Sequence, residues 1–145
     1  MKKNVLFGLL IIALSIFVVS GCSTPPPPPP PPTTETPQGL VLDGATNYTV
    51  VTGDTLAEIS ASKYGGNYLY YFPLIRLANA NIVPNPDLIE PGTNLVIPDL
   101  KRNLDNVGAN ALIRADMLAI AGQYENQGKP NAAEKLRNEA LRLSK

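Results

Sequence analysis

Few side chains in this sequence are of a type that performs covalent or metal chemistry. The 145 residues contain no His and a single Cys, Cys22. Without His, the chain lacks the side chain that most often acts as a general base near neutral pH and most often binds a metal. One Cys can form neither an internal disulfide nor a zinc site built from thiolates. We therefore expect no metal site, no cofactor and no catalytic residue.

Carboxylates remain as candidates for catalysis, because a pair of them can hydrolyse a glycosidic bond. The acidic residues after position 99 are Asp105, Asp116, Glu125, Glu134 and Glu139. Their spacing places them on solvated faces of predicted helices. We therefore expect a protein that is not an enzyme, and the residues of interest are those that bind a ligand.

The N-terminus is typical of an exported protein. Lys2 and Lys3 precede residues 5–19, a run without charge. This run is shorter than the roughly 20 residues that a membrane-spanning helix needs, and it fits the apolar region of a signal peptide. The alternatives are a plain secretory peptide and the signal of a lipid-anchored protein.

The sequence Val-Ser-Gly-Cys-Ser at 19–23 resembles the lipobox of bacterial lipoproteins. The resemblance implies a signal peptide at 1–21, cleavage after Gly21, and lipidation of Cys22 with palmitate-type acyl chains. It also implies a cellular location, because Ser23 after the Cys favours the outer membrane, facing the periplasm, in a cell with two membranes. In a cell with one membrane, we expect the outer face of that membrane.

Prolines are concentrated directly after this segment. Residues 25–32 are an unbroken run of eight Pro, and residues 33–39 continue without an aliphatic or aromatic side chain. Polyproline II rises about 3.1 Å per residue, so this run alone reaches roughly 25 Å. We interpret 22–42 as a disordered tether that carries the lipid anchor and sets a distance. A ligand for a proline-binding module is the alternative interpretation.

The middle of the chain predicts four short elements. They are a strand at 48–51, a helix at 55–64, a helix at 73–80 and a strand at 94–98. Thr55 and Glu58 have the spacing of a capping box, and Gly65 follows as a helix stop. Residues 90–93, Glu-Pro-Gly-Thr, predict a type II turn before the last strand.

The same segment carries a dense set of motif residues. They are Tyr48, Val50, Gly53, Asp54, Thr55, Leu56, Ile59, Tyr64, Gly65, Ala78, Asn79, Asp87, Leu88, Ile89, Pro91, Gly92, Leu95, Ile97 and Pro98. With this spacing, residues 48–98 resemble a LysM domain. The resemblance implies an α+β domain at 43–99 with a βααβ fold, in which both helices cover one face of a two-stranded antiparallel sheet. It also implies binding of N-acetylglucosamine polymers, which in bacteria are usually peptidoglycan.

The resemblance further implies that the glycan lies in a shallow groove between two loops. The implied binding residues are Gly53, Asp54, Thr55 and Leu56 in the first loop, and Asn81, Ile82, Pro84, Leu88 and Ile89 in the second. Backbone groups suit the sugar's amide and hydroxyls, and small apolar side chains suit its acetyl methyl. Structural roles are the alternative: a turn at Gly53, a helix cap at Asp54 and Thr55, and core packing for Leu56.

The segment 100–145 predicts a C-terminal helical hairpin. Apolar residues recur at helical spacing over 109–127, Gly128 ends that helix, and Pro130 begins a second one. The hairpin either docks on the LysM domain, binds a protein partner or mediates oligomerisation. An aromatic cluster at Tyr68, Tyr70, Tyr71 and Phe72 is a plausible docking surface.

Charge supports docking of the hairpin. The whole chain has a formal net charge of zero, but residues 43–99 carry two basic against six acidic side chains, and 100–145 carry eight basic against five acidic. Zero net charge gives no argument for nucleic acid as a partner.

Together these features predict a membrane-anchored envelope lipoprotein that binds peptidoglycan without catalysis. The alternative is an envelope adaptor or assembly factor whose hairpin binds a protein partner. A role as accessory to a cell-wall hydrolase is a weaker alternative.

Overall fold

The structure has an α+β fold in which a two-stranded sheet with its helices is followed by C-terminal helices. The computed structural model describes residues 39–143. In chain order the elements are β1 (Thr46–Thr49), α1 (Leu56–Tyr64), the 3₁₀ helix η1 (Gly66–Tyr71), α2 (Phe72–Ala78), β2 (Asn94–Ile97), α3 (Leu100–Asp105), α4 (Val107–Asn126) and α5 (Pro130–Arg142). The predicted fold class is confirmed.

Some predicted features lie outside the described residues. They are the signal segment 1–21, the lipidation site Cys22 and the proline run 25–32. Within residues 39–143, no helix combines the length and apolar character needed to cross a bilayer.

The two strands pair antiparallel, with Thr46 opposite Ile97 and Thr49 opposite Asn94. The predicted first strand, 48–51, is shifted by two residues from the observed β1. Val50 lies just beyond β1. Its backbone N–H donates to Thr93 O at 2.9 Å, and its carbonyl accepts from Gly92 N at 2.8 Å, both in the turn before β2. After Val50 the chain leaves the sheet and turns toward α1.

The core of this half lies between the sheet and its helices. Leu95 and Ile97 of β2 are buried, as are the apolar residues of α2. Asn79 follows α2 and is 2% exposed. Its amide nitrogen donates to the carbonyls of Ile75 and Val96 at 2.7 Å, and its Oδ1 accepts from Val96 N at 2.9 Å. This side chain therefore joins the end of α2 to β2 through three bonds to backbone atoms.

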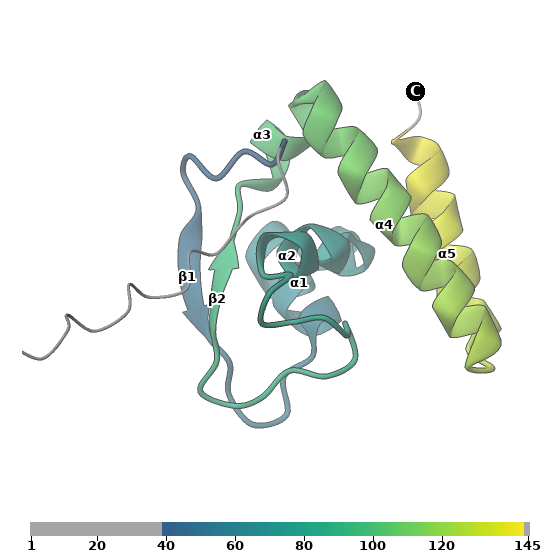
Figure 1. Ribbon diagram of the computed structural model, residues 1–145, viewed down its shortest axis with the longest axis horizontal. Helices are drawn as coiled ribbons and strands as arrows, with labels where there is room; N and C mark the ends of the chain where they lie inside the picture. Colours follow the sequence, from purple (N-terminus) through teal and green to yellow (C-terminus); the bar gives the residue numbers. More distant parts are fainter. Residues whose placement is uncertain (1–38, 144–145) are drawn as a thin grey trace, which may run out of the picture. The chain divides into compact units, whose positions relative to one another are not determined.

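The helical hairpin, α4 and α5, docks on the rest of the described chain. In Figure 1, α2 lies between the sheet and α4, and α2 contacts both β2 and α4. Ile113, Met117 and Ile120 of α4 belong to the same buried cluster as Leu74 and Leu95. Residues 39–143 thus share one core, so a chain shortened to 32–145 keeps every contact described here.

The aromatic cluster forms part of this docking surface. Tyr71 and Phe72 are buried, and Tyr71 donates its hydroxyl hydrogen to Glu139 Oε2 of α5 at 3.3 Å. Burial, together with the Glu139 carboxylate, raises the pKa of Tyr71 to about 12. The docking hypothesis for the cluster is confirmed at Tyr71.

One predicted solvated carboxylate is buried instead. Asp116 of α4 is 8% exposed and forms a two-bond ion pair with Arg76 of α2. The prediction failed because Arg76 lies 40 residues away in the sequence, so helical spacing alone could not reveal its partner.

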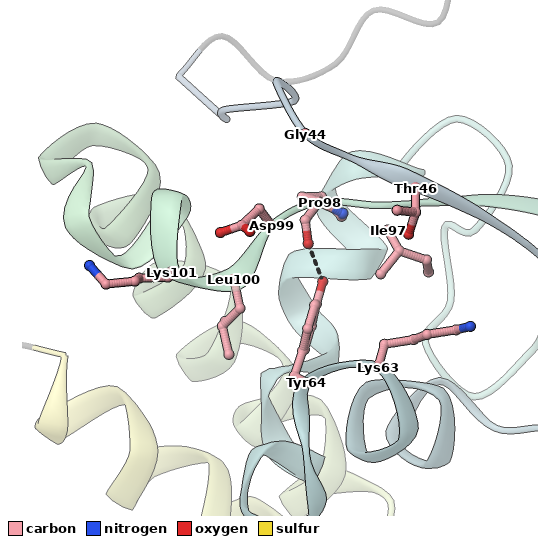
Figure 2. A pocket seen from close by; sticks show the side chains of 9 residues that line it. All are labelled: Gly44, Thr46, Lys63, Tyr64, Ile97, Pro98, Asp99, Leu100 and Lys101. Carbon is pink, nitrogen blue, oxygen red and sulfur yellow. Dashed lines mark hydrogen bonds between the residues drawn. The ribbon is translucent and has the colours of Figure 1, made fainter.

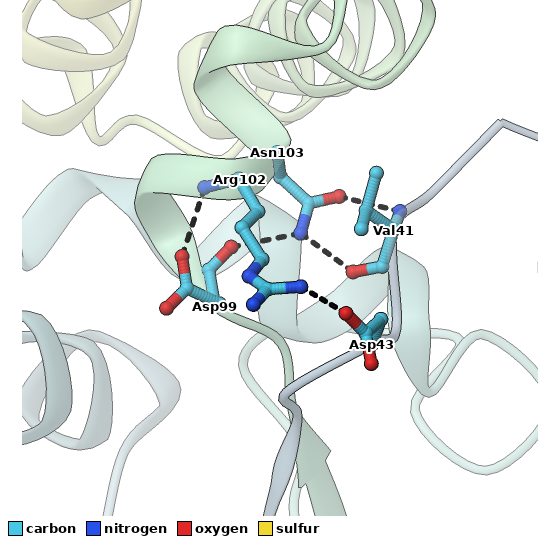
Figure 3. A network of polar contacts seen from close by, with 5 residues as sticks. All are labelled: Val41, Asp43, Asp99, Arg102 and Asn103. Carbon is cyan, nitrogen blue, oxygen red and sulfur yellow. Dashed lines mark hydrogen bonds and ion pairs between the residues drawn. The ribbon is translucent and has the colours of Figure 1, made fainter.

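A polar clamp fixes the start of the described chain (Figure 3). Asn103 of α3 accepts from Val41 N at 2.9 Å and donates to Val41 O at 2.8 Å. Its amide also donates to Asp99 O at 2.8 Å, and the neighbouring Arg102 pairs with Asp43. The short helix α3, which the sequence did not predict, therefore holds Val41 and Asp43. The prediction of a disordered tether over 22–42 is wrong for residues 39–42, because Leu40 packs against the core and Val41 bonds to α3.

Candidate functional site

The loop between β1 and α1 is shaped by its own side chains. Gly53 has φ +97°, a backbone conformation that favours glycine. Asp54 Oδ2 accepts from the Tyr48 hydroxyl at 2.8 Å and from Val51 N at 2.9 Å. Asp54 therefore closes the turn, and its carboxylate is held at the start of α1.

Thr55 is the N-cap of α1. Its Oγ1 accepts from Glu58 N at 3.2 Å and donates to Glu58 Oε2 at 2.9 Å. The predicted first half of the capping box is present, but the glutamate accepts from the hydroxyl of Thr55 rather than from its backbone N–H. Leu56, the next residue, is 1% exposed and belongs to the core.

Both loops meet at one cavity of about 290 Å³, which we call the loop cavity. Its lining residues are Asp54, Thr55, Leu56, Ala57, Phe72, Pro86, Asp87, Ile89 and Tyr124. Leu56 and Phe72 are buried apolar side chains, whereas Asp54, Thr55 and Asp87 are polar. No Lys or Arg is among the lining residues. A cavity with an apolar base and a few polar groups suits a small neutral ligand.

A second cavity of about 220 Å³, the outer pocket, is formed by the loop between α2 and β2. Ile82, Pro84 and Leu88 line it together with Ile89, which also lines the loop cavity. Ile82 and Leu88 are exposed apolar side chains, at 53% and 65%. The two hollows therefore adjoin at Ile89.

The predicted site residues divide between these two hollows. Asp54, Thr55, Leu56 and Ile89 come together in the loop cavity, and Ile82, Pro84, Leu88 and Ile89 come together in the outer pocket. Gly53 and Asn81 are exposed and line neither.

Comparison with known proteins gives a name to this arrangement. Residues 48–98 match the family model described as the LysM domain. The chain contains a LysM domain. LysM domains are non-catalytic modules that bind glycans of the peptidoglycan and chitin type, so this match supports glycan binding by the chain.

The chain also matches short segments of longer proteins. An uncharacterized protein of Deinococcus radiodurans is 44% identical over 55 residues, which are 38% of this chain and 20% of that protein. An esterase of Mycobacterium tuberculosis is 35% identical over 65 residues, which are 45% of this chain and 13% of the esterase. The matches thus span a fifth or less of these relatives. No solved structure matches the chain.

Sequence reasoning missed five of the nine residues that line the loop cavity, namely Ala57, Phe72, Pro86, Asp87 and Tyr124. Phe72 was assigned to the docking cluster, and Tyr124 to the apolar face of the hairpin. Pro86 and Asp87 follow Asn85 in the second LysM loop, and Asp87 was among the motif residues without a binding role. Only the neighbouring motif residues pointed to Pro86 and Asp87, and no local pattern could place Tyr124 beside them.

Asp87 is the polar junction between the LysM domain and α4. Its Oδ1 accepts from the Tyr124 hydroxyl and its Oδ2 from Lys129 Nζ, each at 2.5 Å. Burial alone raises the pKa of Asp87, but the hydrogen bonds from Lys129 and Tyr124 outweigh it, and the pKa lies below its ordinary value. Burial, followed by the bond to Asp87, raises the pKa of Tyr124 above its ordinary value.

A further hollow of about 300 Å³ lies where β2 leads into α3 (Figure 2). Tyr64 donates to Pro98 O at 2.9 Å there, and Lys63, Asp99 and Lys101 are also in its lining. In Figure 2 the two lysine side chains extend in opposite directions. They do not converge on one anion, and this hollow shares no lining residue with the loop cavity.

Proposed function

We propose that this protein is an envelope lipoprotein that binds the glycan strands of peptidoglycan without cleaving them. The observation that carries the proposal is the loop cavity, at which both loops of the LysM domain meet. Its apolar base suits an acetyl methyl and a pyranose face, and its carboxylates and loop backbone suit amide and hydroxyl groups. A lining without basic side chains fits a neutral sugar better than a phosphate.

Two-ended attachment is the mechanism that we propose. Acyl chains on Cys22 insert into lipid, where each buried CH₂ contributes about 0.8 kcal/mol. The proline run sets the distance, and the LysM domain holds the glycan. A single domain binds weakly, and many copies in one membrane gain avidity, because each bound copy raises the effective concentration of the others at the glycan.

Co-sedimentation with purified sacculi tests glycan binding. Residues 32–145 are expected to pellet with sacculi, and Leu88→Asp is expected to weaken pelleting severalfold by placing a charge at the outer pocket. Leu118→Asp is the matched control, since Leu118 is an exposed leucine, at 42%, and lines neither the loop cavity nor the outer pocket. A folded protein that stays in the supernatant contradicts the proposal.

Radiolabelled palmitate tests the anchor separately. In a bacterial host, the full chain is expected to take up label and to fractionate with membranes. Cys22→Ser is expected to lose the label and the membrane association. Persistence of the label in that variant contradicts lipidation at Cys22.

A further inference from the structure

The loop cavity is not bounded by the LysM domain alone. Tyr124, from the middle helix of the C-terminal segment, is one of its lining residues. We infer that the glycan site is composite, with α4 supplying the Tyr124 ring as a binding surface beside the two LysM loops. This inference rests on the proposed function and goes beyond it, since it makes the hairpin part of the binding site.

Two contacts hold the Tyr124 ring in place, and the residues that make them are paired with each other. Its hydroxyl donates to Asp87 Oδ1, and Lys129 Nζ, which pairs with Asp87 Oδ2, lies 4.8 Å from the ring centroid. Tyr124 as a whole residue is 8% exposed, so the surrounding side chains hold the ring before a ligand arrives. A preformed surface is advantageous because no side-chain entropy is lost when the sugar binds.

The side chains around Tyr124 in the loop cavity suit a pyranose. Where it borders the loop cavity, the aromatic ring offers a small apolar area for a C–H group of a sugar. Asp87 and Asp54 each use part of their acceptor capacity on protein donors, and a carboxylate has about four acceptor positions. Their remaining lone pairs can accept from sugar hydroxyls beside the ring.

The hairpin is fixed independently of the cavity, so Tyr124 is placed by more than its own bonds. Arg76 and Asp116 join α2 to α4, and Tyr71 and Glu139 join η1 to α5. None of these four residues lines the loop cavity. The pair Tyr71–Glu139 therefore supplies a matched control: it is a second tyrosine–carboxylate bond between the hairpin and the rest of the chain.

Calorimetric titration of residues 32–145 with an N-acetylglucosamine tetramer tests the inference. Tyr124→Ala is expected to weaken binding about tenfold, because it removes the ring. Tyr124→Phe keeps the ring and is expected to stay within about twofold of the unaltered protein, as is Tyr71→Phe. Unchanged or tighter binding by a folded Tyr124→Ala overturns the inference, and tighter binding identifies the hairpin as a cover over the groove.

A second measurement requires no variant. In the complex of the unaltered protein, the Tyr124 ring protons are expected to show nuclear Overhauser effects to the sugar. Contacts from Thr55 and Ile89 to the sugar without any from Tyr124 overturn the composite site and leave the proposed function standing. Absence of binding by the unaltered protein instead removes the proposed function itself.

Discussion

The LysM domain and the helical hairpin are positioned by interactions of very different sequence range. In the LysM domain, Thr55 caps α1 through Glu58, three residues later, and Asn79 reaches β2 across 17 residues. The hairpin is placed by Arg76–Asp116, Asp87–Tyr124 and Tyr71–Glu139, which span 40, 37 and 68 residues. Short-range hydrogen bonds thus shape the LysM domain, whereas long-range side-chain pairs position the hairpin against it.

The largest expected effect comes from breaking the buried contact between the two regions. Asp116→Ala leaves Arg76 without its partner, and the two side chains are only 9% and 18% exposed. Removing one member of such a pair costs about 3–5 kcal/mol of unfolding free energy. Urea denaturation measures this loss.

An exposed ion pair within the hairpin is the control for that substitution. Arg137 and Glu125 join α5 to α4, with side chains 40% and 56% exposed. Glu125→Ala is expected to cost less than about 1 kcal/mol. Equal losses for Asp116→Ala and Glu125→Ala would show that the junction between the regions contributes no special stability.

Substitution of two buried asparagines, Asn79 in the LysM domain and Asn103 in α3, is expected to have an intermediate effect on the unfolding free energy. Asn79→Ala removes three hydrogen bonds inside the LysM domain and leaves backbone groups of α2 and β2 buried, so we expect a loss of about 2–3 kcal/mol. Asn103→Ala also removes three bonds, two of them to Val41.

Water can replace those two bonds when the segment around Val41 detaches, and we therefore expect a smaller loss, about 1–2 kcal/mol. Hydrogen exchange and urea denaturation measure both variants. A larger loss for Asn103→Ala than for Asn79→Ala would contradict this ranking.

The smallest expected effect concerns pH at the junction. Because the pKa of Asp87 is lowered in the folded protein, its ionised form stabilises the fold. This contribution is present above the unfolded-state pKa of about 3.9, and it is lost as the pH falls through the lower folded value. A carboxyl NMR titration is expected to place Asp87 below its ordinary pKa.

Lys129→Met removes one of the two donors to Asp87 and is expected to move that titration upward. Lys101→Met is the control, since Lys101 pairs with Asp105 and lies outside the loop cavity. An Asp87 titration that Lys129→Met leaves unchanged would contradict the assigned cause.

The range of each interaction also explains what the sequence could predict. The capping box at Thr55, the stop at Gly65, the turn at 90–93 and the helix begun by Pro130 are local, and each was predictable from neighbouring residues. The helix α3 was not predicted, although Asp99 caps it through Arg102 N. Its short length left no apolar periodicity to recognise.

The candidate site was predictable only on its LysM side. Asp54, Thr55 and Ile89 belong to motifs with fixed spacing, whereas Tyr124 occupies a helical position that periodicity assigns to the core. That assignment is correct, since Tyr124 is buried, but it does not say which cavity the ring borders. Such a contact depends on how two separately encoded regions dock.

Amide chemical-shift mapping of residues 32–145 with an N-acetylglucosamine tetramer tests the central claim most directly. We predict that the largest shifts fall at 54–57, at 87–89 and at Tyr124, the residues around the loop cavity that carry a backbone N–H. Shifts centred on the hollow between Lys63 and Lys101, or saturation without any shift at 54–57, would contradict glycan binding in the loop cavity.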